Sequence, residues 1–126
     1  MYEKGKLVIK EDNVTTLIYN GEFDNNNFKG KGELEIIGKV IYKGDFKNNN
    51  RDGMGVEEDL VKKTKYIGEF VSDKRHGYGE LIYLNRENVR LRGFWDNGDV
   101  RPGEGIYCTK EGRVLGEVSA DDIAMQ

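Results

Sequence analysis

The chain has 126 residues, of which 37% are hydrophobic and 34% are charged, and its formal net charge is -3. This length allows one domain, and the small apolar share favours a thin or elongated architecture over a compact globule. The negative charge argues against a nucleic-acid partner. The 17 glycines stand against a single proline, without a G-X-Y period, which excludes collagen and argues against a disordered linker.

A single cysteine, Cys108, cannot form a disulfide within the chain, which favours a reducing compartment. The N-terminus lacks the apolar segment of a secretory leader, and no stretch approaches the ~20 apolar residues of a membrane helix. We therefore expect a soluble, cytoplasmic protein. Association with the cytoskeleton or with a membrane surface stays open.

Most of the chain repeats one pattern, in which an aromatic residue, a glycine and a second aromatic residue alternate along a strand. The third copy is the most complete: Tyr66, Gly68 and Phe70 share a face, and a polar turn leads to Gly77 and Gly79. Period-two alternation between Asn- and Asp-rich turns predicts a β-hairpin for each copy. The array is expected as a partial unit at 4–18, full units at about 19–41, 42–65, 66–90 and 91–113, and a partial unit at 114–118.

The two partial units each match one strand of the hairpin. The segment 5–9 matches the second strand, and the segment 114–118 matches the first. Consecutive hairpins should pair into an elongated, single-layer antiparallel meander, which is an all-β fold. The tail 119–126 begins with a capping-box-like Ser119 and Asp122 and predicts at most a short helical cap.

Glycine recurs in mid-strand at Gly21, Gly44, Gly68 and Gly93. Because glycine weakens a strand, its recurrence indicates a need for space. We expect an aromatic ring to lie flat over each bare stretch of backbone. For the later Gly-x-Gly pairs, a simple turn role stays open.

The pattern Y-x-G-x-[FW], a polar turn and H-G-x-G resembles the MORN repeat (membrane occupation and recognition nexus). It is most complete at 66–79, where His76 occupies the histidine position. The first two units have Lys29 and Asp52 there. The fourth has Leu91 for the tyrosine and one inserted residue, so we expect its turn to bulge or open. The resemblance implies a scaffold that binds partner proteins, dimerises in several relatives and has been proposed to bind phospholipids.

The sequence offers little for catalysis. A dyad of His76 and Cys108 is the only nucleophile arrangement that the composition allows, and the two residues belong to different units. We expect His76 to be a turn residue and Cys108 a small apolar filler. The chain shows neither metal-ligand spacing nor a dinucleotide-binding glycine motif. We therefore predict no enzyme activity, no cofactor and no metal.

Two functional hypotheses remain, of which the first is protein binding. Because a one-layer sheet cannot bury both faces, its aromatic rings would line a groove for a helix or an extended segment of a partner. The alternative is that the rings pack on one another as a thin core. The groove residues would be Tyr19, Phe23, Tyr42, Phe46, Tyr66, Phe70, Trp95 and Tyr107.

The second hypothesis is binding of acidic phospholipid headgroups by the mildly basic middle of the chain. Each basic residue near an anionic membrane contributes about 1 kcal/mol. Interspersed acids favour instead a mixed, solvated face. The headgroup residues would be Lys62, Lys63, Lys65, Arg90 and Arg92.

The outermost strands of an open sheet present unpaired backbone groups. The segment 114–118 is therefore a candidate edge for strand addition. A homodimer through the terminal hairpins stays open as well.

Overall fold

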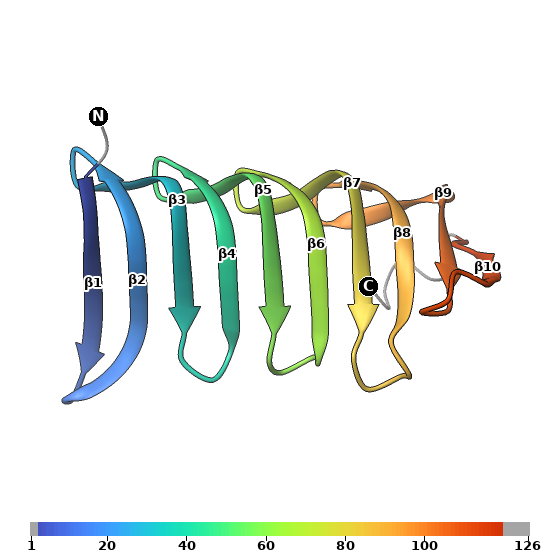
Figure 1. The fold of residues 1–126 in the computed structure, drawn as a ribbon, viewed down its shortest axis with the longest axis horizontal. Coiled ribbons are helices and arrows are strands. Elements are labelled where there is room, and N and C mark those ends of the chain that lie inside the picture. The colour runs from blue at the N-terminus through green and yellow to red at the C-terminus, as the bar shows by residue number, and fades with distance from the viewer. Residues whose placement is uncertain (1–2, 120–126) are drawn as a thin grey trace.

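The structure, a computed structural model that describes residues 3–119, is one open antiparallel sheet whose strands lie in chain order (Figure 1). The predicted all-β meander of hairpins is confirmed. No helix forms within residues 3–119, so none there could cross a membrane. The helical cap predicted at 119–126 lies, apart from Ser119, outside the described residues. The strands are β1 (Glu3–Glu11), β2 (Val14–Asp24), β3 (Asn27–Ile36), β4 (Val40–Lys47), β5 (Asn50–Asp59), β6 (Thr64–Val71), β7 (Lys74–Tyr83), β8 (Val89–Asp96), β9 (Asp99–Cys108) and β10 (Val114–Glu117).

Each full hairpin closes with a two-residue turn in the left-handed region. Asn25 and Asn26 have φ angles of 50° and 66°, and Ser72 and Asp73 have 48° and 69°. Turns of this kind follow the twist of the strands and favour Asn, Asp and Gly. Because the third turn contains only two residues, His76 lies in β7 opposite Glu69, so the prediction of a turn residue was wrong.

The hairpins bend sharply where their glycines pair. Gly68 faces Gly79, and the β6–β7 register shifts immediately after Gly68. Gly77 supports the bend with a φ of 64°, a conformation that few other residues adopt. Equivalent shifts follow the paired glycines of the other three full hairpins, and in Figure 1 the upper ends of the strands fold over. The residue pair Tyr66 and Phe70 meets inside the bend, so we call this side the inner face and the opposite side the outer face.

The core is a ladder of aromatic rings on the inner face. Neighbouring rings meet edge to face with centroids 5.1–5.3 Å apart, which is the geometry that aromatic quadrupoles prefer. The contacts run without interruption through three full hairpins into the fourth. In order, this aromatic ladder contains Phe23, Tyr19, Phe46, Tyr42, Phe70, Tyr66 and Trp95.

The paired glycines make room for the tyrosines of the ladder. The Tyr66 hydroxyl donates to the carbonyl of Glu69 at 3.1 Å and lies directly over Gly79. A Cβ on Gly79 would stand only 2.1 Å from that hydroxyl oxygen. The predicted ring over bare backbone is confirmed in the first three full hairpins and was wrong at Gly93, where Val100 takes its place. The second glycine of each pair has a packing role rather than a turn role.

In the fourth hairpin a different side chain fills the space over the paired glycines. Leu91 replaces the tyrosine, and a methyl group of Val100 fills the space over Gly93 and Gly105. The turn at Asn97 stays two residues long, so of the two predicted alternatives it is the bulge that forms and not the opening. In β9, Val100 pairs with Trp95 and Gly105 pairs with Gly93. The segment between these two pairs is one residue longer than the matching segment of β7, so the inserted residue lies within the strand.

Candidate interaction surface

The aromatic rings predicted to line a groove are mostly buried. Phe23 and Tyr107 are half-buried, and the other six expose almost no surface from which to contact a partner. The structure therefore corresponds to the stated alternative, in which the rings pack on one another as a core. The six buried rings are Tyr19, Tyr42, Phe46, Tyr66, Phe70 and Trp95.

A layer of side chains covers the ladder, and the sequence reading missed it. The Arg75 guanidinium lies over the rings of Tyr66 and Trp95, at 5.2 and 5.3 Å from their centroids. It also pairs with the Glu57 carboxylate at 3.2 Å, and that carboxylate pairs with Arg51 from the preceding hairpin. Cation–π contacts and a shared carboxylate thus close the inner face.

The signal for this layer was a fixed position in the repeat. Each full unit has its covering residue at the same sequence distance from the first residue of the unit. These residues are Phe28, Arg51, Arg75 and Val100. In the first hairpin Phe28 stacks on Tyr19 with the two ring planes 5° from parallel. A periodic residue without a fixed chemical type is hard to recognise from one sequence, because aromatic, cationic and aliphatic groups all cover a ring.

Burial keeps the core hydroxyls protonated. Desolvation raises the pKa of Tyr42 and Tyr66 well above the usual range of a phenol, and the nearby carboxylates contribute in the same direction. Each hydroxyl already donates to a backbone carbonyl of its own hairpin. These tyrosines act as structural donors and offer no group that titrates near neutral pH.

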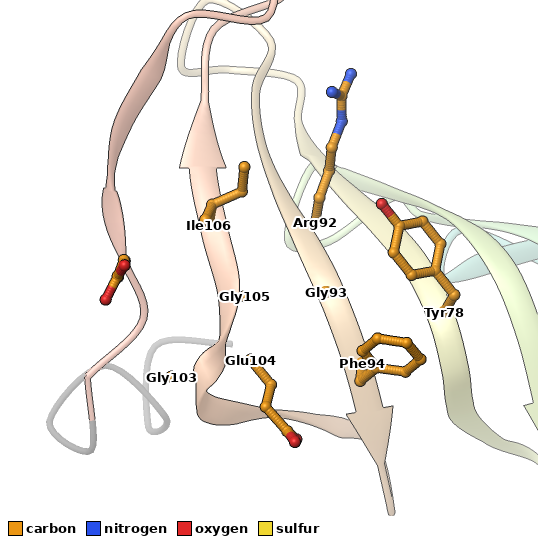
Figure 2. A pocket seen from close by; sticks show the side chains of 9 residues that line it. Tyr78, Arg92, Gly93, Phe94, Gly103, Glu104, Gly105 and Ile106 are labelled. Carbon is orange, nitrogen blue, oxygen red and sulfur yellow. The ribbon is translucent and has the colours of Figure 1, made fainter.

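The exposed aromatic surface lies on the outer face. Tyr78 and Phe94 face each other across β7 and β8, with 59% and 52% of their surface exposed and ring centroids 5.5 Å apart. Beside them is an open hollow of about 420 Å³, which Figure 2 shows between this pair and Ile106 of β9. Arg92 also lines the hollow. We call Tyr78, Arg92, Phe94 and Ile106 the outer patch.

The matching outer positions of the earlier hairpins are less apolar. Lys31 faces Asp45 across β3 and β4, and Met54 faces Glu69 across β5 and β6. An aromatic pair therefore occurs at the seam between the third and fourth hairpins and at neither earlier seam. Two features of the sequence indicated this pair: Tyr78 lies between two glycines, and Phe94 directly follows Gly93 in the next strand.

The comparisons with known proteins agree with this repeat geometry. The family model of the MORN repeat matches residues 19–35, 42–59 and 66–85. The chain contains three MORN repeats. These matched segments contain the three hairpins whose tyrosines lie on paired glycines. MORN repeats are a non-catalytic family of protein- and membrane-interaction modules. A search of curated proteins matched none to this chain.

The basic residues proposed for lipid headgroups fall into two groups on the MORN array. Lys62 and Lys63 are exposed in the connection between β5 and β6, and Lys65 is half-buried in β6. The remaining two, on β8, share one carboxylate: Arg90 and Arg92 bond to Glu80 at 2.9 and 2.7 Å. That carboxylate also raises the pKa of Arg92. The two arginines and Glu80 together carry one net positive charge.

The remaining candidates for chemistry lie apart on the MORN array. His76 is exposed in β7, whereas Cys108 is fully buried at the end of β9 opposite Arg90. Within residues 3–119, no three His, Cys, Asp or Glu side chains are grouped as a metal site would require. The outer patch is therefore the best-defined candidate for function.

Proposed function

We propose that this MORN array is a non-catalytic scaffold that binds a segment of a partner protein at the outer patch. The observation that carries the proposal is the solvent-exposed Tyr78–Phe94 pair beside an open hollow. Rigid aromatic side chains provide large contact area at low entropic cost and dominate many protein interfaces.

The residues that line the hollow indicate which side chains a partner would present. The apolar floor of Tyr78, Phe94 and Ile106 accepts a large apolar side chain. Carboxylates of Glu104 and Glu117 lie at the rim, while Arg92 is already engaged by Glu80. The fitting partner is a helix or an extended segment that presents an apolar anchor next to basic residues.

Affinity capture with a matched pair of variants tests this proposal. The test variant carries Tyr78→Ser and Phe94→Ser, and the control carries Val14→Ser and Val61→Ser, which are exposed to a similar degree but lie elsewhere. We expect a protein that the wild type and the control retain but the test variant loses. Equal capture by all three would overturn the outer patch as the binding site.

Sedimentation with vesicles separates the alternative of a membrane-binding module. Salt-sensitive pelleting with acidic phospholipid vesicles, lost on Lys62→Ala and Lys63→Ala, would favour the lipid hypothesis over protein binding. We expect no pelleting at physiological salt, because acids are interspersed among the basic residues of this surface. A cytoplasmic location, free or at the cytoskeleton, is part of the same proposal.

A further inference from the structure

The two end strands of the sheet carry complementary halves of the repeat. β1 has the pattern of a second hairpin strand, and β10 has the pattern of a first strand. Within residues 3–119, β1 pairs only with β2 and β10 only with β9, so each has an outer edge that no described strand covers. Open edges of this kind are templates for pairing with another chain.

Both ends also expose apolar side chains. In β1, Leu7, Val8 and Ile9 are 38%, 40% and 41% exposed, and in β10 Val114 and Leu115 are 58% and 48% exposed. Interior strands of the array bury or half-bury most residues of these types. The ends therefore resemble interior strands from which one neighbour has been removed.

The register of the sheet shows how the two ends would meet. Residues in register form rows from strand to strand, and the row that begins at Leu7 ends at Gly116. The adjacent row begins at Lys6 and ends at Glu117. With ten alternating strands, β10 runs antiparallel to β1, so a following copy continues the alternation without a rotation.

We propose that copies of this chain associate head to tail, with β10 of one copy paired antiparallel to β1 of the next. In the continued register, Lys6 faces Glu117, so opposite charges meet. Leu7 faces Gly116, where a Cβ would meet nothing within 4 Å, so the leucine has space. Val118 donates its backbone N–H to the Gly105 carbonyl, and in the continued register its side chain faces Gly5. Cross-strand pairs of this type stabilise sheets.

Pairing of like ends fits less well. Lys4, Lys6 and Lys10 point to the same face of β1, so two β1 strands would bring lysines together. β10 has only four residues to offer a second β10. A head-to-tail contact leaves one free end on each side, and the assembly therefore grows beyond a dimer. One short strand pair is smaller than the about 1,200–2,000 Å² of standard interfaces, so growth requires high protein concentration.

Disulfide trapping tests the contact and its register. In a Cys108→Ala background, one preparation carries Leu7→Cys and another carries Gly116→Cys, and the two are mixed under mild oxidation. We expect a cross-linked dimer in the mixture at several-fold higher yield than in either preparation alone. The control mixture replaces Leu7→Cys by Val8→Cys, which is equally exposed but points to the other face.

Two results of the trapping experiment would overturn the proposal. Equal yields in the test and control mixtures would mean random collision, and efficient cross-linking of the Leu7→Cys preparation alone would mean β1–β1 pairing. A second measurement keeps Cys108: Lys6→Glu and Glu117→Lys should each lower the average mass in sedimentation equilibrium, and mixing the two should restore it. Unchanged masses would contradict head-to-tail growth. Neither test involves Tyr78 or Phe94, so the result is independent of the outer patch.

Discussion

The third and fourth hairpins fill the same space with different side chains. In the third, the Tyr66 ring covers Gly68 and Gly79, and its hydroxyl bonds to the backbone across the bend. In the fourth, Leu91 is too short to reach the glycines, and Val100 supplies the missing volume. The frame of the repeat is thus the glycine pair, and the group that covers it can change.

The comparison also predicts that two positions of the repeat depend on each other. The tyrosine of the third hairpin is covered by Arg75, and the tyrosine of the second by Arg51. Where leucine replaces tyrosine, the residue at the arginine position is Val100, which turns inward. A long ring therefore requires a covering group, and a short side chain requires a filling group.

Among the substitutions that compare the two hairpins, we expect the largest effect at their paired glycines. Gly79→Ala places a Cβ against the Tyr66 ring and should cost roughly 3 kcal/mol of unfolding free energy. Gly105→Ala would place a Cβ 2.8 Å from a Val100 methyl group and 3.1 Å from the Arg92 carbonyl, a milder overlap than at Gly79, and should cost about 1 kcal/mol. Urea unfolding measures both, with Gly116→Ala as a nearly neutral control in open space. Equal losses at Gly79 and Gly105 would contradict the difference in packing.

A double-mutant cycle tests the coupling in the fourth hairpin. Leu91→Tyr alone forces a ring into space that Val100 occupies and should cost about 2 kcal/mol. Adding Val100→Arg recreates the third hairpin's combination and should recover at least half of that loss. Urea unfolding of the two single variants and the double variant gives the coupling energy. Strict additivity would mean that the two positions are independent.

The buried tyrosines predict alkaline instability. Their pKa is raised on folding, so the stability they contribute is complete below the unfolded value of about 10 and is lost as pH rises above it. Thermal unfolding followed over a range of roughly pH 8 to 11, which brackets the phenol pKa of about 10, should show a falling melting temperature only at the alkaline end. Tyr66→Phe should weaken this pH dependence while costing about 1 kcal/mol at neutral pH, because the Glu69 carbonyl loses its donor. An unchanged alkaline slope would argue against an ionisable buried hydroxyl.

The smallest expected effect on stability lies on the outer face between these two hairpins. Tyr78→Ser and Phe94→Ser should each change the unfolding free energy by less than ~1 kcal/mol, since both rings are more than half exposed. Phe70→Ala, on the inner face, should cost about 3–5 kcal/mol. Comparable losses on the two faces would mean that the outer pair is also part of the core.

The hairpins could be predicted from the sequence because the patterns that indicate them are local. Alternation, polar turns and glycines under Tyr66 all act within one unit, so one sequence predicts them. The placement of His76 failed because the polar run after Ser72 extends into β7, and only the two left-handed residues define the turn. Polarity alone does not separate a turn from the exposed start of a strand.

The site was harder to predict because it depends on how the hairpins bend. A flat sheet would leave the ring of Tyr66 exposed, whereas the bend at Gly68 and Gly79 folds Phe70 onto it. The same bend turns Tyr78 and Phe94 outward. The candidate surface thus lies on the opposite face from the predicted groove, and the bend, which arises from register shifts between strands, is not visible in alternation patterns.

The most direct test of this account uses Trp95, the single tryptophan of the chain. Its side chain is 1% exposed at the end of the aromatic ladder, and its indole nitrogen donates to the Gly79 carbonyl at 3.1 Å. The account predicts blue-shifted fluorescence from the folded protein, with quenching by iodide far below that of the urea-unfolded chain. Red-shifted emission that iodide quenches equally in the folded and unfolded states would contradict it, because the inner face would then be an open groove.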